Sequence, residues 1–203
     1  MIFPDAATLA AFLAASLALN FTPGADLMFA LASGASGGPR AAVAASLGIN
    51  LGVAVHVALA ALGLAALIAA NPAAYDLIRY VGAVYLIWLA VQIWRAPPPA
   101  PGEESRAALG RIVLRGFATN ILNPKTMLFI FAFLPQFADP ARGPVGAQIA
   151  ALGGLFICTG FSVNACVGGL AGAATGRLRR GSKLMNRVSA VVFVGLAARL
   201  VVD

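Results

Sequence analysis

The fold of this chain is decided by two stretches, Asn20-Phe-Thr-Pro23-Gly24-Ala-Asp26 and Asn120-Ile-Leu-Asn123-Pro124-Lys125. Each lies inside a long apolar run and places a helix-capping residue, Thr22 or Asn123, directly before a proline. Thr and Asn favour the N-cap position of a helix, and Pro favours the first helical position. The pattern predicts that each apolar run is a broken helix whose second half begins at the proline.

The composition of the chain is that of a membrane protein. Of 203 residues, 61% are hydrophobic and 10% are charged, and the mean hydropathy is +0.90; in a soluble domain about a quarter of the residues are charged. A helix needs about 20 apolar residues to cross the hydrocarbon. Candidate spans cover residues 8–33, 41–70, 77–94, 116–137, 145–174 and 188–202. The sequence therefore predicts an all-α integral membrane protein with six transmembrane helices.

A Pro-rich and charged stretch near the middle of the chain, residues 96–111, indicates a cytoplasmic linker. It separates a first repeat, residues 1–95, from a second repeat, residues 112–203. Residues 21–29 match residues 122–130 in their cap, their proline and their apolar tail. Because three helices per repeat is an odd number, the two repeats insert in opposite orientations. We therefore expect two inverted three-helix repeats in one membrane domain, each with a Pro-broken first helix.

Basic residues are distributed unevenly over the two sides of this predicted topology. One side carries ten of them, Arg40, Arg95, Arg106, Arg111, Arg115, Arg177, Arg179, Arg180, Lys183 and Arg187. The other side carries Arg79, Arg142 and Arg199. Lys and Arg in short loops stay cytoplasmic, so both termini are expected on the periplasmic or extracellular side. The isoelectric point near 10.5 then reflects topology, and nucleic acid is not an expected partner.

Asp26 and Lys125 are the charged side chains that lie deep within the candidate spans. An ionisable residue inside a membrane span is a functional hypothesis by default. Asp26 can hold a substrate ammonium or a coupling proton. Lys125 can hold a substrate carboxylate, together with the free N–H groups of the half-helix that begins at Pro124. Alternatively, Asp26 and Lys125 form a structural salt bridge that joins the repeats without a role in transport.

Other polar side chains near the breaks are candidates for the same site. Irregular backbone within hydrocarbon survives where it is buried in protein or lines a polar cavity, so two breaks predict one shared cavity. The alternative is a pair of proline kinks whose backbone groups are satisfied by Thr22, Asn20, Asn120 or water. His56, the single histidine, is a candidate proton relay or a neutral side chain bonded to a backbone carbonyl. The candidate substrate-binding or coupling residues are Asp26, Lys125, Thr22, Pro23, Gly24, Asn123, Pro124, Asn20, Asn120, His56 and Asn50, of which Asn50 is a weaker candidate, as is Asn164.

Several motifs spread along the chain form a combination found in a known family. They are Asn20 through Asp26, Gly37-Gly38-Pro-Arg40 through Gly48, Gly52 with His56, Gly82-Ala-Val-Tyr85, Asn120 through Lys125, and Phe133-Leu-Pro135-Gln136-Phe137. Together they resemble the lysine exporter and homoserine/threonine exporter family over nearly the whole chain. The resemblance implies a bacterial inner-membrane exporter of amino acids or related metabolites, with six helices, driven by the proton gradient as an antiporter and assembled as a homodimer. The family often has Pro-Gly-Pro where this chain has Pro23-Gly24-Ala25.

Three other classes of function compete with export of an amino acid. A divalent-metal exporter of a related fold is disfavoured because a hard cation needs several oxygen ligands, and Asp26 is the only acidic residue within the spans. A thiol oxidoreductase needs two cysteines that meet, but Cys158 and Cys166 are roughly 12 Å apart along one predicted helix. A hydrolase is disfavoured because the chain offers no convincing triad around His56. No nucleotide-binding signature is present in the sequence, so ATP is not expected to drive transport within this chain. We expect neither a cofactor nor a bound metal.

The charge asymmetry predicts that the linker near Ala100 faces the cytoplasm. A single cysteine placed there, with Cys158 and Cys166 replaced by serine, should react with a membrane-impermeant maleimide only in inside-out vesicles. A cysteine at Ala141, in a loop of the opposite side, is the matched control and should react only in intact cells. External labelling at residue 100 would overturn the orientation and the inverted repeat with it.

Overall fold

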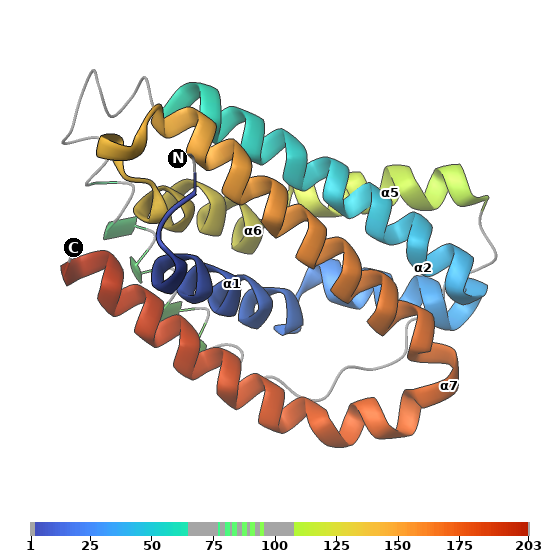
Figure 1. Cartoon of the computed structure of the whole chain (residues 1–203). Coiled ribbons are helices and arrows are strands. Elements are labelled where there is room, and N and C mark those ends of the chain that lie inside the picture. The colour runs from blue at the N-terminus through green and yellow to red at the C-terminus, as the bar shows by residue number, and fades with distance from the viewer. Residues whose placement is uncertain are drawn as a thin grey trace.

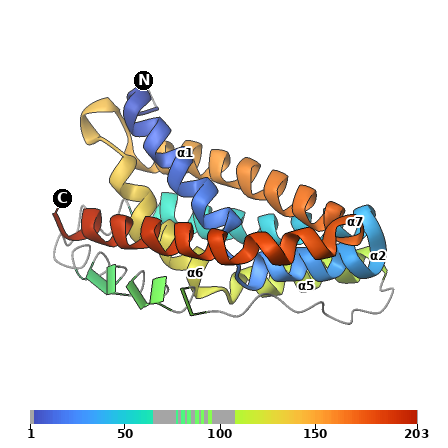
Figure 2. The same ribbon diagram turned by 90° about the horizontal axis from the view of Figure 1, so that it is seen from below.

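The computed structural model describes residues 3–64, 77, 80, 81, 83, 84, 87, 88, 90, 91, 94, 95 and 108–202. The described residues contain no strand and fold into a bundle of helices (Figure 1). The elements are α1 (Ala6–Phe21), α2 (Ala25–Leu59), a π-helical turn η1 (Ala60–Leu64), α5 (Leu109–Ile121), α6 (Pro124–Leu128), a π-helical turn η2 (Phe129–Phe133), two 3₁₀ turns η3 (Leu134–Phe137) and η4 (Pro140–Arg142), and α7 (Val145–Val202). Both ends of the described chain lie at the same end of the bundle in both ribbon views (Figures 1 and 2).

Helix α1 begins at a capped residue and ends at the first predicted break. The carboxylate of Asp5 accepts hydrogen bonds from the backbone N–H (3.0 Å) and the hydroxyl (2.9 Å) of Thr8. These bonds lower the pKa of Asp5 below its ordinary value. Because the pKa is lowered in the folded state, the cap contributes stability at neutral pH and loses it as the pH falls through the lowered pKa. The helix ends at Phe21, and helix α2 starts four residues later.

Helix α2 is two helical segments joined at a sharp kink. Gly38 has φ 75° and ψ −170°, a backbone conformation that is essentially restricted to glycine. Pro39 follows and starts the second segment, where its fixed φ suits a first helical position. The chain reverses direction at this end of the bundle (Figure 1). The predicted first span, residues 8–33, is therefore α1 plus the first segment of α2, and the predicted second span begins in the second segment.

Helices α5 and α6 form the second predicted break. Their axes are bent by 55° between Leu109–Ile121 and Pro124–Phe137. Helix α5 packs closely on α2, because a Cβ at Gly48 would overlap the backbone carbonyl of Val113. Small residues at this spacing let helix backbones approach where lipid gives no hydrophobic driving force between helices.

The described helices account for part of the predicted six-span topology. Ala25–Gly63 and Val145–Leu170 are long and apolar enough to cross a membrane, and the bent pair Leu109–Ile121 with Pro124–Phe137 makes a third span if it is counted as one. Ala6–Phe21 is a shorter apolar helix. The described residues between 77 and 95 are helical. The rest of the predicted third span, somewhat less than half of it, and residues 96–107 of the predicted linker lie outside the described residues.

Two predicted boundaries are wrong. The fourth span was expected from residue 116, but α5 begins at Leu109, so the end of the predicted linker is helical. The fifth and sixth spans were expected as separate helices, but α7 is helical without interruption from Val145 to Val202. A straight helix of 58 residues would be about 87 Å long, and α7 instead bends so that its C-terminal part runs back along the bundle (Figures 1 and 2). The run of basic residues in this region does not end the helix, because Arg and Lys are good helix formers.

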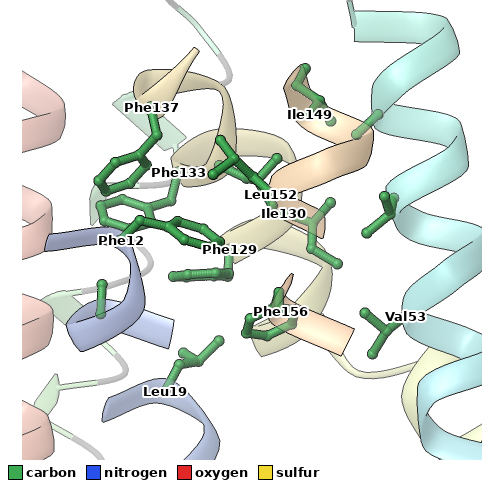
Figure 3. Close-up of a cluster of buried hydrophobic side chains, with 14 of the residues drawn as sticks. Phe12, Leu19, Val53, Phe129, Ile130, Phe133, Phe137, Ile149, Leu152 and Phe156 are labelled. Atoms are coloured by element: carbon green, nitrogen blue, oxygen red, sulfur yellow. The ribbon is translucent and has the colours of Figure 1, made fainter. Parts of the chain in front are cut away.

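The apolar core holds the two broken helices together. Phe129, Phe133 and Phe137 lie along one side of the segment that follows α6 and are buried (Figure 3). The ring of Phe137 meets Phe12 of α1 at 5.2 Å between centroids, and the ring of Phe129 stacks on Phe156 of α7 at 5.0 Å. Edge-to-face and offset-stacked contacts at these distances are favourable. These three phenylalanines therefore pack the broken first helix of each predicted repeat against the other, and both against α7.

Candidate functional site

The two helix breaks, far apart in sequence, lie against each other in the structure. A Cβ at Gly24, in the first break, would stand 2.9 Å from Nζ of Lys125, which follows the second break. Both Asp26 and Lys125 are buried, at 8% and 7% exposed. The contact shows that the two breaks meet at one place in the structure. It also gives Gly24 a role: a side chain there would displace the Lys125 ammonium.

Lys125 reaches across from the second break to the end of α1. Its ammonium donates to the backbone carbonyls of Leu19 at 3.3 Å and Thr22 at 3.1 Å. The carbonyl of Leu19 also accepts the backbone N–H of Thr22 at 3.1 Å. Carbonyls at the end of a helix carry partial negative charge. Although Lys125 lies in the first turn of α6, its ammonium reaches the negative end of α1. An ammonium has three N–H donors, so two bonds leave one for a ligand.

Asp26 lies in the first turn of α2 and is bonded by residues of the other break. Its Oδ2 accepts hydrogen bonds from Nδ2 of Asn120 at 2.9 Å and from the hydroxyl of Thr126 at 3.0 Å. Its Oδ1 is buried and makes no hydrogen bond to any described residue. Asp26 and Lys125 do not form an ion pair within 4.0 Å in this conformation. Each charge is instead bonded to neutral groups of the opposite break.

A small polar cavity lies between these groups, with a volume of about 20 Å³. Its lining comes from α1, both segments of α2, α6 and α7, and consists of Leu19, Asn20, Asp26, Leu27, Ile49, Asn50, Val53, Lys125, Thr126, Phe156, Gly160 and Asn164. Leu19, Val53 and Phe156 belong to the apolar cluster of Figure 3, so the cavity adjoins the aromatic core. The volume holds about one water molecule. An amino acid does not fit, so this conformation is closed.

Asn120 connects the cavity to His56. Its amide nitrogen bonds Asp26, and its backbone carbonyl lies 3.4 Å from Nε2 of His56. The histidine ring also stands edge-on to Phe131, with 6.2 Å between centroids. His56 does not line the cavity. The structure therefore matches the reading of His56 as a side chain bonded to a backbone carbonyl, one residue removed from Asp26.

The caps of the two breaks differ, and only one follows the prediction. Asn123 is the N-cap of α6, because its Oδ1 accepts the N–H of Lys125 at 3.1 Å, and Pro124 is the first helical residue. Thr22 was predicted to cap the second half-helix but is instead the C-cap of α1, because its hydroxyl donates to the carbonyl of Ala18 at 2.6 Å. Pro23 stays in the break, and Gly24 is the N-cap of α2 without a side-chain bond.

Several residues of the site were not found from the sequence. Thr126, the second donor to Asp26, looks like an ordinary residue of an apolar run. Gly160 lies opposite the breaks on α7, and nothing in its spacing distinguishes it from packing glycines. Asn164, a weaker candidate, does line the cavity. No group of three His, Cys, Asp or Glu side chains gathers among the residues that the structure describes.

Apolar helices that are broken around two buried charges are typical of helical membrane transporters. The LysE type translocator family matches residues 17–203. The chain belongs to this family, so it is a transporter and not an enzyme.

Individual proteins similar to this chain include efflux proteins and a membrane protein. A homoserine/homoserine lactone efflux protein of Salmonella typhimurium is 33% identical over 145 residues, 70% of each chain. A leucine efflux protein of Salmonella choleraesuis is 28% identical over 195 residues, 93% of this chain and 92% of its own. A membrane protein of Vibrio cholerae is 34% identical over 134 residues, 65% of each chain. No solved structure shows a significant match.

The hydrogen bonds of Lys125 predict that replacing Lys125 lowers the stability of the fold. A second substitution at Asp26 is not expected to restore that stability. Lys125→Met removes one of the two donors to the carbonyl of Leu19 and the ammonium donor to the carbonyl of Thr22, and the expected loss is about 1–3 kcal/mol. The melting temperature of the purified protein should fall, and it should not recover in the double variant with Asp26→Asn. Recovery in the double variant would mean that the two charges stabilise each other directly.

Proposed function

We propose that this protein exports amino acids or closely related metabolites across the bacterial inner membrane by proton-coupled antiport. The observation that carries the proposal is the meeting of two helix breaks around one closed polar cavity that contains a buried carboxylate and a buried ammonium. Membership in a translocator family and the names of the efflux relatives support the same class of substrate.

The unused hydrogen-bond donor of Lys125 and the unused acceptor of Asp26 suit a zwitterion. Lys125 has one N–H left to donate, and Asp26 has one oxygen, Oδ1, left to accept. An α-amino acid presents the complementary pair, a carboxylate and an ammonium. The start of α2 has no side-chain cap, so its first N–H groups can add to the carboxylate subsite.

The same carboxylate suits a coupling proton. Oδ2 of Asp26 is held by two neutral donors, which keep the group in place in either protonation state, while Oδ1 makes no hydrogen bond to any described residue. If substrate and proton compete for Oδ1, release of one follows binding of the other. Such competition is the minimal requirement for antiport, because it couples two opposed fluxes through one group.

The closed cavity requires the helices to separate before a substrate enters. Alternating access around the two breaks fits this requirement, with the two predicted repeats, residues 1–95 and 112–203, rocking against each other about the linker. The breaks occupy matching places in the two repeats, which favours the inverted arrangement of six helices. The proposal includes the cytoplasmic linker, both termini on the outer side, and assembly as a homodimer.

Proton coupling predicts that Asp26→Asn stops gradient-driven export. The amide keeps the acceptor oxygen for Asn120 and Thr126, so the fold should survive, but it cannot exchange a proton. In proteoliposomes with an imposed pH gradient, export of leucine or homoserine should fall by about tenfold or more. Asp5→Asn is the matched control, because Asn also caps a helix and Asp5 is exposed. Normal export with normal pH dependence in the Asp26 variant would exclude the coupling role.

The carboxylate subsite predicts a specific loss of recognition in Lys125→Met. Wild type should bind leucine about tenfold or more tightly than leucinamide, because a charged hydrogen bond is lost in the amide. In the folded fraction of the variant, leucine and leucinamide should bind equally. A variant that still prefers the acid would show that the carboxylate lies elsewhere, for example at the start of α2 alone.

A further inference from the structure

Asn50, in the second segment of α2, presents an unused acceptor to the cavity. Its Nδ2 donates to the backbone carbonyl of Ser46 at 2.8 Å. This bond fixes the orientation of the amide, because a flipped amide would place two oxygens against each other. Its Oδ1 is buried and makes no hydrogen bond to any described residue. Asn50 as a whole is 6% exposed.

Asn20, at the end of α1, is oriented in the same way by a chain of two bonds. The hydroxyl of Thr159 donates to the carbonyl of Phe156 at 3.0 Å, so its proton is committed and its oxygen is an acceptor. Nδ2 of Asn20 donates to that oxygen at 3.1 Å. The remaining atom of the amide, Oδ1, is therefore an acceptor as well.

The two amide oxygens converge on one point above Gly160 of α7. A Cβ at Gly160 would stand 3.3 Å from Oδ1 of Asn20 and 3.4 Å from Oδ1 of Asn50. Asp26, whose Oδ1 is also unused, lines the same cavity. Three acceptors from three helical segments, one of them on a carboxylate, thus border a space that the missing side chain of Gly160 keeps open.

We infer that Asn20, Asn50 and Asp26 form a subsite for a primary ammonium group, with Gly160 as its floor. The inference rests on the proposed function and assigns the amino end of the substrate to one side of the cavity, opposite the carboxylate subsite at Lys125. An ammonium has three donors and no acceptor, which matches three acceptors. A hydroxyl would use one of them and leave buried oxygens unsatisfied, which is costly.

The subsite selects by the number of N–H groups and by size. N-acetylation of an amino acid removes the charge and two donors, and N-trimethylation removes every donor. Both changes also add bulk where Gly160 leaves room for no more than a small group. The structure therefore assigns the substrate class as small molecules with a free primary amine, whatever the side chain.

Three probes separate the two ends of the substrate: leucine, 3-methylbutylamine, which lacks the carboxylate, and 4-methylpentanoate, which lacks the amine. Their binding to purified full-length protein can be measured by equilibrium dialysis. Asn50→Leu keeps the approximate shape and removes the acceptor. We expect leucine and 3-methylbutylamine to bind about tenfold or more weakly to this variant, and 4-methylpentanoate to change by less than about twofold.

Gly160→Ala provides an independent test that leaves every polar group in place. Its methyl group would occupy the point on which the two amide oxygens converge, so binding of both amines should weaken by about tenfold. Gly154→Ala is the matched control, because Gly154 lies on the same helix and a Cβ there meets nothing within 4 Å. The control should bind all three probes as wild type does.

The outcomes distinguish this inference from the proposed function. If Asn50→Leu and Gly160→Ala bind leucine normally, or lose 4-methylpentanoate to the same degree as 3-methylbutylamine, the ammonium subsite is wrong while amino-acid export stands. If wild type binds 3-methylbutylamine but no amino acid, the proposed substrate is wrong and the subsite stands. If wild type binds 4-methylpentanoate but neither amine, the subsite is wrong. Binding of none of the three contradicts both.

Discussion

A helix that stops inside a membrane leaves carbonyls and N–H groups that no lipid can satisfy, and the structure of this protein depends on how two such stops satisfy each other. Lys125, beside the second break, donates to the carbonyls at the end of α1. Asp26, beside the first break, accepts from Asn120 and Thr126 around the second. The exchange is reciprocal, so neither break is complete without the other. Packing of the two broken helices is thereby a condition for burying either charge.

The same exchange keeps the two charges apart. A direct salt bridge would use up both groups and leave the carbonyls of α1 without a cation. With each charge bonded to neutral partners of the opposite break, one donor of Lys125 and one oxygen of Asp26 remain available within a single cavity. A buried site with one acidic and one basic side chain, each with an unused hydrogen-bonding position, can exchange ligands without first breaking an ion pair in a low-dielectric interior.

Apolar packing holds this polar centre in place. The phenylalanines that follow α6 contact α1 and α7 directly, and the close approach of α2 and α5 at Gly48 leaves little freedom between them. The cavity adjoins this packed core and holds about one water molecule, so opening it requires helices to move as bodies. The break residues and the kink at Gly38 are the places where the helical hydrogen-bond ladder is already interrupted.

The sequence by itself determined the solvent, the helical class, the position of both breaks and the two charged residues, because composition, proline and intramembrane charge each act through local physics. It also indicated Asn20 and Asn120 as polar groups near the breaks, and Asn50 as a weaker candidate for the cavity. The role of Thr22 was not predicted, because a threonine hydroxyl can accept from an N–H of the following helix or donate to a carbonyl four residues earlier. In the structure it donates to the carbonyl of Ala18 at the end of α1. The single helix from Val145 to Val202 was missed because helix-forming basic residues resemble a loop when they follow an apolar run. The partners of Asp26 and Lys125, and the convergence of two amide oxygens over Gly160, were decided by tertiary structure alone. They join residues about a hundred positions or more apart, and no local pattern specifies which buried polar atoms of distant helices will face each other.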